Sequence, residues 1–143
     1  MSYVKVWIHA VWGTKNHEKL LTKDIRRVLF QHIKVNGKEK NLYIDHVNGY
    51  FDHVHCLFTL NADLSLSKTL QLIKGEASFW ANKNKLVQPN LAWADDYFAA
   101  SVSESIVPKV REYIKNQEEH HKSLTFKEEF DRFIEKFNLK HQG

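Results

Sequence analysis

The sequence has 143 residues, of which 43% are hydrophobic and 27% are charged. That length suits one ordinary domain, and the composition excludes an intrinsically disordered chain. No stretch approaches the roughly 20 consecutive apolar residues of a transmembrane helix, so we expect no membrane partner. The net charge of +4 is uneven: residues 1–88 carry 13 basic and 7 acidic side chains, whereas residues 89–143 carry 8 and 10. A basic front part is compatible with a nucleic-acid face, although it is also what a solvated surface looks like.

The single cysteine, Cys56, has no partner for an intrachain disulfide. Residues 1–5 lack the basic start and the small-residue cleavage site of a secretion signal. Both features predict a cytoplasmic protein in a reducing compartment.

The first half of the chain alternates between strand and helix patterns. Residues 3–12 place apolar side chains at every second position, which predicts a half-buried strand. Thr22 and Asp24 open a helix that we expect to end in the polar stretch 36–38. Residues 41–48 and 53–60 then predict two strands of a hairpin.

The second half is predicted to be mostly helical. Residues 65–84 repeat apolar side chains at helical spacing, and one further strand is expected within residues 92–102. A helix follows over about residues 104–122, and the last helix covers about residues 125–138. That last helix opens on a Thr-x-x-Glu capping box at Thr125 and carries one apolar stripe, which consists of Phe126, Phe130, Phe133 and Phe137.

This order of elements predicts an α+β fold of the ferredoxin-like, split βαβ type. An antiparallel sheet would carry two helices on one face, within about residues 1–103. The helix over 104–122 and the C-terminal helix would complete a single domain of residues 1–143. The opposite face of the sheet is left for these later helices or for a partner to cover.

The strongest chemical signal is the run Asp-His-Val-His at residues 52–55. Side chains alternate along a strand, so His53 and His55 project from one face, about 7 Å apart along the chain. Two imidazoles held side by side on a rigid strand can chelate one divalent cation. The alternative is that two histidines merely flank a buried valine.

A second signal lies in the predicted helix over 104–122. Tyr113 and Gln117 are four residues apart, so they share one helical face. Phosphoryl transfer needs an oxygen nucleophile and a cation that polarises the phosphate. Tyr113 offers the nucleophile, while His53, His55 and the carbonyl oxygen of Gln117 offer cation ligands. Ordinary amphipathic packing is the alternative for the tyrosine.

The motifs together resemble one family, the single-tyrosine HUH transposases (transposase A) of the smallest insertion sequences. Residues 49–55 resemble the HUH motif of that family. The resemblance continues in residues 11–15, 73–78, 93, 97–102, 113–117 and 120–121, in matching order and spacing. Family members usually have proline where this chain has Phe51, a change that would only loosen the turn into the strand.

The resemblance implies a DNA transposase, an endonuclease and strand transferase that acts on single-stranded DNA at hairpin-marked element ends. Tyr113 would attack a backbone phosphate, form a 5′-phosphotyrosine linkage and release a 3′-OH. His53, His55 and Gln117 would coordinate Mg²⁺ or Mn²⁺. An obligate homodimer is also implied, with active sites in trans that combine the histidines of one subunit with the tyrosine helix of the other.

Contacts to DNA are expected from the basic front part. Lys15 and Lys74 are the best candidates for phosphate contacts, with plain solubility as the alternative for each. Trp7, Trp12 and Tyr50 have ring faces suited to unpaired bases, and core packing is the alternative for each.

Two other functions remain open. The first is another HUH nicking enzyme, a replication initiator or a relaxase-like domain, which shares the metal site and the tyrosine. The second is a non-catalytic module that binds single-stranded nucleic acid on the same type of fold. His120 and His121 are expected at a solvated helix end, and we leave them outside the site.

Overall fold

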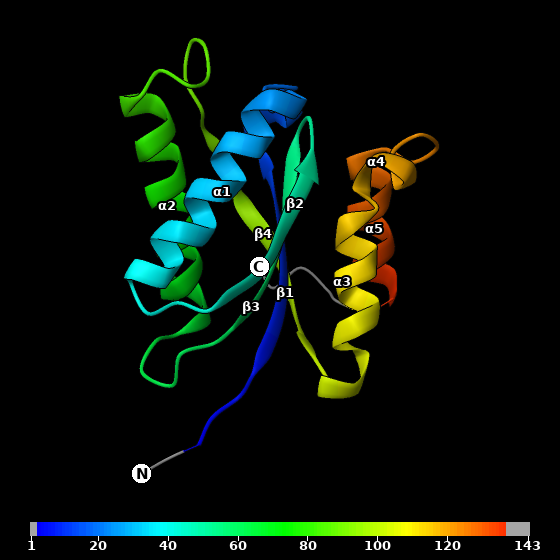
Figure 1. The fold of residues 1–143 in the computed structure, drawn as a ribbon. Helices are drawn as coiled ribbons and strands as arrows, with labels where there is room; N and C mark the ends of the chain where they lie inside the picture. Colours follow the sequence, from blue (N-terminus) through cyan, green and yellow to red (C-terminus); the bar gives the residue numbers. More distant parts are fainter. Residues whose placement is uncertain (1–2, 137–143) are drawn as a thin grey trace.

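The computed structural model describes residues 3–136, and its centre is a four-stranded antiparallel sheet. The strands are β1 (Trp7–Thr14), β2 (Ile44–Tyr50), β3 (His53–Thr59) and β4 (Trp93–Val102), in the order β2-β3-β1-β4. Helices α1 (Lys23–Glu39) and α2 (Leu66–Lys83) cover one face of this sheet (Figure 1). The predicted ferredoxin-like arrangement is therefore confirmed.

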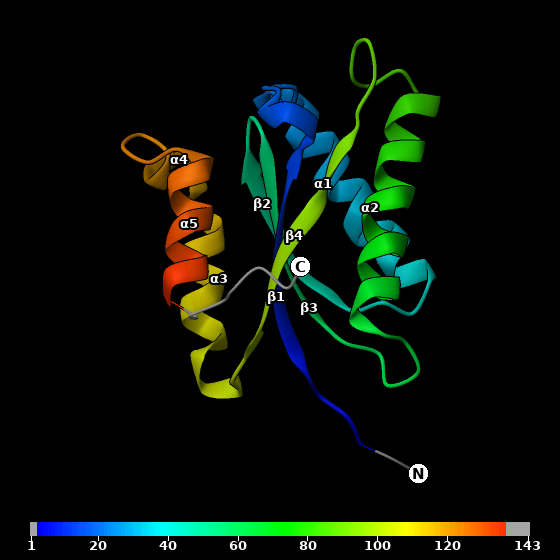
Figure 2. The same ribbon diagram turned by 180° about the vertical axis from the view of Figure 1, so that it is seen from behind.

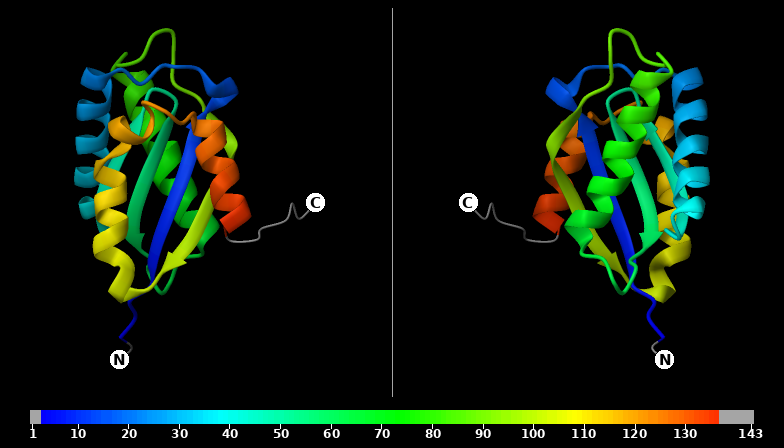
Figure 3. Two further views of the ribbon diagram at one scale, coloured as in Figure 1. Left: turned by 90° about the vertical axis from the view of Figure 1, so that its right-hand side faces the viewer. Right: turned by 90° about the vertical axis from the view of Figure 1, so that its left-hand side faces the viewer.

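The opposite face of the sheet is covered by the end of the same chain. After β4 come the short 3-10 turn η2 (Glu104–Ile106), α3 (Val107–Lys115), α4 (Gln117–His120) and α5 (Phe126–Lys136). Figures 1 and 2 show these helices on the side of the sheet away from α1 and α2. In Figure 3, left, α3 crosses the β2 and β3 side while α5 lies toward β4. Side chains from β1 and β3 that point to this face are thus enclosed between sheet and helices.

The helix predicted over residues 104–122 is interrupted, so the prediction of one continuous helix is wrong. The backbone leaves helical geometry at Asn116, where φ is −96° and ψ is 29°. Asparagine is a weak helix former because its amide competes for backbone hydrogen bonds. The break turns α4 relative to α3, and it places Gln117 at the start of the new helix.

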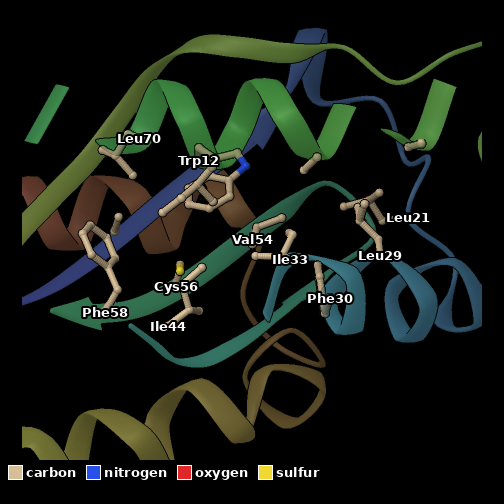
Figure 4. Packing of buried hydrophobic residues seen from close by; sticks show 14 of the residues in the cluster. Trp12, Leu21, Leu29, Phe30, Ile33, Ile44, Val54, Cys56, Phe58 and Leu70 are labelled. Atoms are coloured by element: carbon tan, nitrogen blue, oxygen red, sulfur yellow. The ribbon is translucent and has the colours of Figure 1, made fainter. Parts of the chain in front are cut away.

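The main core lies between the sheet and the α1–α2 layer. Trp12 of β1, Cys56 of β3 and Leu70 of α2 are buried there (Figure 4). The other side chains of β1 face α3–α5, so all eight residues of the strand are buried. The strand begins at Trp7 rather than at residue 3, and Val4 is 52% exposed.

Helix α1 runs past the stretch that was predicted to end it. Gly37 lies inside the helix and is buried, and a Cβ added there would lie 2.6 Å from Cδ1 of Ile44. The glycine therefore lets α1 approach β2 closely. The chain leaves the helix through Asn41, whose φ of 59° is the left-handed conformation that ends many helices.

Helix α5 begins as predicted. The backbone N–H of Glu128 donates to Oγ1 of Thr125 at 3.1 Å, and that of Thr125 donates to Oε1 of Glu128 at 3.1 Å, which is a capping box. The stripe of Phe126, Phe130 and Phe133 packs with Val11 and Phe98 of the sheet, while Phe137 lies outside the described residues. Over residues 3–136, no helix is long and apolar enough to cross a membrane.

Candidate metal and nucleophile site

The two histidines of β3 lie at the centre of the face covered by α3–α5. Both His53 and His55 are 0% exposed, and Val54 between them points into the core on the other side of the sheet. The direction predicted for these side chains from the period of a strand is confirmed. The burial is complete because the later helices close over the sheet.

Gln117 faces the same centre from α4. Its Oε1 lies 3.0 Å from Nε2 of His53 and 3.3 Å from Nε2 of His121. Gln117 and His53 are buried, and the side chain of His121 is 2% exposed. His121 therefore belongs to the cluster, and the prediction that it sits at a solvated helix end is wrong.

A carboxylate that no motif of the sequence indicated completes the cluster. Glu129 of α5 is 1% exposed. Its Oε1 lies 3.0 Å from Nε2 of His55 and 3.3 Å from Nε2 of His53, and 3.4 Å from Nε2 of His121. One oxygen atom thus faces three imidazoles.

Tyr113 of α3 is brought to the same carboxylate. Its hydroxyl donates to Oε2 of Glu129, the oxygen that the histidines leave free. The ring of His120 stacks on the ring of Tyr113, with centroids 4.3 Å apart. Nε2 of His120 is buried without a hydrogen-bond partner among the described residues. The predicted nucleophile and the predicted metal ligands therefore lie together within one chain.

The spacing of the donor atoms fits a divalent cation. Neighbouring ligands of an octahedral ion with bonds of about 2.1 Å lie about 3.0 Å apart. The distances from His55 to Glu129 and from His53 to Gln117 are both 3.0 Å. The ligand atoms of His53, His55 and Glu129 all lie within 4.8 Å of one another. Two imidazoles with amide and carboxylate oxygens form a donor set suited to Mn²⁺ and, through the oxygens, to Mg²⁺.

Hydrogen bonds from outside the cluster orient both histidines. Nδ1 of His53 lies 2.9 Å from Oδ1 of Asp52, so Nε2 is the nitrogen that faces the centre. Nδ1 of His55 lies 2.9 Å from Nε2 of His9 on β1, again leaving Nε2 toward the centre. Such outer partners fix the ring orientation and tautomer of metal-binding histidines.

Electrostatics set different protonation preferences within the metal-free cluster, and a cation would bind His53 only in its neutral form. Burial lowers the pKa of His55 to about 4, so this imidazole is neutral at pH 7. Burial alone would lower the pKa of His53, but its contacts with Asp52 and Glu129 outweigh burial and raise the pKa. Burial alone would raise the pKa of Glu129, but hydrogen bonds from His121, His53 and His55 lower the pKa. The carboxylate is therefore ionised.

The hydroxyl of Tyr113, the predicted nucleophile, is held protonated. Burial, together with the hydrogen bond to Glu129, raises the pKa of Tyr113 above its ordinary value of 10.0. To act as the predicted nucleophile, the hydroxyl would have to pass its proton to a neighbouring group. Glu129 is the acceptor already in contact with that proton.

The two lysines predicted to contact DNA lie elsewhere. Lys15 is exposed in the 3-10 turn η1 (Lys15–His17), directly after β1. Lys74 of α2 donates through Nζ to the carbonyl oxygen of Ala94 at 3.0 Å, and its Nζ lies 5.7 Å from the ring centroid of Tyr97. Burial lowers the pKa of Lys74, partly offset by two nearby aspartates. In this conformation the hydrogen bond of Lys74 links α2 to β4. A contact between Lys74 and DNA stays a prediction.

Sequence signals existed for two of the three residues that were missed. Glu129 interrupts the apolar stripe of α5, where an acid on the buried face needs a partner. His9 alternates with the core-facing residues of β1, which puts it on the same face of the sheet as His55. His121 gave no comparable signal, because its place depends on the break at Asn116.

Comparisons with known proteins agree with this fold. The fold is similar to that of a crystal structure of a putative transposase from Deinococcus radiodurans R1, with a TM-score of 0.63 and 22% identity, covering 82% of this chain and 95% of that chain. It is also similar to a REP-associated tyrosine transposase bound to a REP hairpin, with a TM-score of 0.56 and 19% identity, covering 85% of this chain and 72% of that chain.

Among curated proteins, none is similar enough to be matched to the chain. The family described as "Transposase IS200 like" matches residues 2–117. That range includes His53, His55, Tyr113 and Gln117, and it ends before α5 and Glu129. Since the match spans most of the sequence, the chain belongs to the IS200-like transposase family.

Proposed function

We propose that this transposase cleaves and rejoins single-stranded DNA at hairpin-marked element ends through a 5′-phosphotyrosine intermediate. One observation carries the proposal: the hydroxyl of Tyr113 and Nε2 of both His53 and His55 converge on the carboxylate of Glu129. Oε1 of Gln117 lies beside them, 3.0 Å from Nε2 of His53. A tyrosine hydroxyl beside a cation site supplies what phosphoryl transfer without a nucleotide requires. The solved relative bound to a REP hairpin supports the choice of DNA hairpins as partners.

His53, His55 and Gln117 would hold Mg²⁺ or Mn²⁺, with Glu129 as a further ligand. A bound cation would supply a positive charge that polarises the scissile phosphate. Asp52 and His9 keep Nε2 of each histidine directed at this place through their hydrogen bonds. The four proposed ligands are 0–1% exposed, so the side chains of α5 must shift to admit a phosphate.

Tyr113 would attack the phosphorus atom as its hydroxyl proton passes toward Glu129. A bond forms between Oη of Tyr113 and phosphorus, and the bond from phosphorus to the 3′ oxygen breaks. The departing 3′ oxygen takes up a proton and becomes a free 3′-OH. The covalent linkage conserves the energy of the phosphodiester, so a second 3′-OH can reverse the step without ATP.

The test is a search for covalent protein–DNA adducts. Hairpin oligonucleotides taken from imperfect palindromes beside the coding region would be incubated with the protein and Mn²⁺, with the strand labelled at its 3′ or its 5′ end. We expect the 3′ label to migrate with the protein on a denaturing gel and the 5′ label to appear on a free fragment. Adducts carrying the 5′ label would contradict the proposed polarity.

The same assay separates the alternatives. A non-catalytic binding module would shift the hairpin on a native gel without forming an adduct. An initiator or relaxase-like nicking enzyme would form the adduct. A transposase must in addition cut at both hairpin-marked ends of one double-ended substrate and join the excised ends, giving a ligated junction that sequencing detects.

A further inference from the structure

A groove opens beside the site and is formed by three separate segments of the chain. It encloses about 940 Å³. Its walls are the segment after β1, the turn between β2 and β3, and the loop from α4 into α5. The lining residues are His17, Lys19, Tyr50, Phe51, Asp52 and residues 121–128. We call it the turn groove.

The turn groove leads to the catalytic cluster. The ring of Phe126, which lines the groove, stacks on the ring of His53 with centroids 4.3 Å apart and planes inclined by 3°. His121 also lines the groove, and its ring centroid lies 4.5 Å from that of His53. A nucleic-acid strand lying in the turn groove would therefore be separated from the predicted metal ligand His53 by a single side chain.

The lining combines the two features that recognise single-stranded nucleic acid. Tyr50 and Phe51 are half-buried in the lining. The ring of His121 stacks on that of Tyr50 with centroids 5.0 Å apart, so an incoming base would extend this stack or displace His121. Arg26 lies beneath them, with its guanidinium 5.5 Å from the ring centroid of Tyr50 and 5.2 Å from that of Phe51. Aromatic faces on a basic surface let successive bases stack while the cations neutralise phosphates.

The charge of the turn groove favours a polyanion. Lys19, Lys122 and Lys127 are exposed on its wall. Their acidic counterparts are Asp52, which lies 2.9 Å from Nδ1 of His53, and Glu128, which accepts from Thr125. Lys122 and Lys127 pair with Glu119 and Asp131, but all four of these side chains are at least 61% exposed. Such pairs exchange readily for phosphate contacts.

Two other grooves fit this role less well. One lies between α2 and β4 and includes Asp95, and the other lies between α1 and β2. Both are bordered by the helices of the α1–α2 layer, on the opposite side of the sheet from His53 and Gln117. Neither has a lining residue in contact with His53, as the turn groove has in Phe126 and His121.

We propose that the turn groove binds the single-stranded DNA that flanks the scissile phosphate, with bases stacked on Tyr50 and Phe51 and phosphates held by Lys19, Lys122 and Lys127. The proposal rests on the proposed function and adds to it a path for the strand.

The experiment compares two probes by fluorescence anisotropy. One is a DNA hairpin alone, and the other is the same hairpin with a single-stranded oligo(dT) tail of about ten nucleotides, attached at the 5′ or the 3′ end. The variants are Lys122→Ala/Lys127→Ala and Tyr50→Leu. Matched controls are Lys34→Ala/Lys38→Ala, at the groove between α1 and β2, and Tyr50→Phe, which keeps the ring.

We expect the wild type to bind one tailed probe more tightly than the hairpin alone. The Lys122→Ala/Lys127→Ala variant should lower the slope of log affinity against log salt by about 0.7 for each phosphate that is no longer neutralised, on the tailed probe only. Tyr50→Leu should weaken tailed-probe binding about five- to a hundredfold, while Tyr50→Phe preserves it. The Lys34→Ala/Lys38→Ala control should match the wild type.

Three outcomes would overturn the proposal: no gain in affinity from either tail, equally weakened binding of tailed and untailed probes, or equally weakened binding in the lysine control. Thermal melting of each variant separates weaker DNA binding from misfolding. The adduct assay on the wild-type protein tests the proposed function independently of these binding measurements. Formation of the adduct together with any of the three outcomes would reject DNA binding in the turn groove and leave the proposed function standing.

Discussion

The hydroxyl of Tyr113 donates to Oε2 of Glu129, 16 residues further along the chain, while the other oxygen of that carboxylate faces His55 at 3.0 Å. A single side chain thus connects the predicted nucleophile with the predicted metal ligands. Glu129 lies on α5, beyond the residues 2–117 that match the transposase family. The last described helix therefore supplies a part of the site that the matched region does not contain.

Replacing Glu129 tests this connection. Glu129→Gln keeps the shape of the side chain but removes its charge, and we expect Mn²⁺ affinity to fall at least tenfold because a charged ligand is removed. Isothermal titration of the DNA-free protein measures it, and Glu128→Gln on the exposed side of the same helix is the control. Unchanged Mn²⁺ affinity with faster cleavage would contradict a ligand role and would indicate that Glu129 fills the place of the phosphate.

Gln117 allows a test in which one variant retains a ligand. Gln117→Leu removes the carbonyl oxygen and should weaken Mn²⁺ binding, whereas Gln117→Glu keeps an oxygen there and should bind at least as well as the wild type. The rise in melting temperature on adding Mn²⁺ reports this, since stabilisation grows with ligand concentration over Kd. If Gln117→Leu gains as much from Mn²⁺ as the wild type, Gln117 is not a ligand.

Tyr113→Phe removes one oxygen and should abolish the covalent adduct. Hairpin binding should stay nearly unchanged, because the ring keeps its place beside His120. Adduct formation and native gel shift would be measured on the same preparation. Adduct formed at more than a trace level would place the nucleophile elsewhere.

The stability of the metal-free protein should fall on acidification because of His9. Burial lowers the pKa of His9 from 6.5 to about 3. Below pH 6.5 the unfolded chain therefore binds a proton that the folded chain does not. The free energy of unfolding accordingly decreases as the pH is lowered, by at most about 1.4 kcal/mol per pH unit. Urea unfolding between about pH 6.5 and 5, with chelator present, should be less steep in pH for His9→Phe. Equal slopes would show that His9 titrates normally when folded.

Within this single chain, the predicted nucleophile Tyr113 and the predicted ligand His53 meet at Glu129, which is an arrangement in cis. A homodimer with sites in trans, which the family resemblance implies, stays a prediction. Mixing Tyr113→Phe with His53→Ala/His55→Ala under subunit exchange distinguishes the two arrangements. In trans, each heterodimer regains one intact site and forms adduct. In cis, every site lacks either the tyrosine or the histidines, and no adduct forms.

The local features of this protein could be predicted from its amino-acid order. The period of two along residues 53–59 sets His53 and His55 on the face away from the core, and Thr125 with Glu128 marks the start of α5. These features depend on backbone geometry within a few residues, which repeats in every strand and every helix start. The order of strands and helices then limited the topology to a ferredoxin-like sheet.

The residues that meet at the site could be identified only from the folded chain. Glu129 reaches His55 across 74 residues of chain, and His9 reaches it across 46. Their contacts follow from the break at Asn116 and from the packing of Phe126 on the sheet, which turn α4 and α5 over the histidines. A periodic pattern shows which face of an element is buried. Which other element covers that face depends on long-range packing. The same packing decides whether an acidic side chain on that face lies beside three imidazoles.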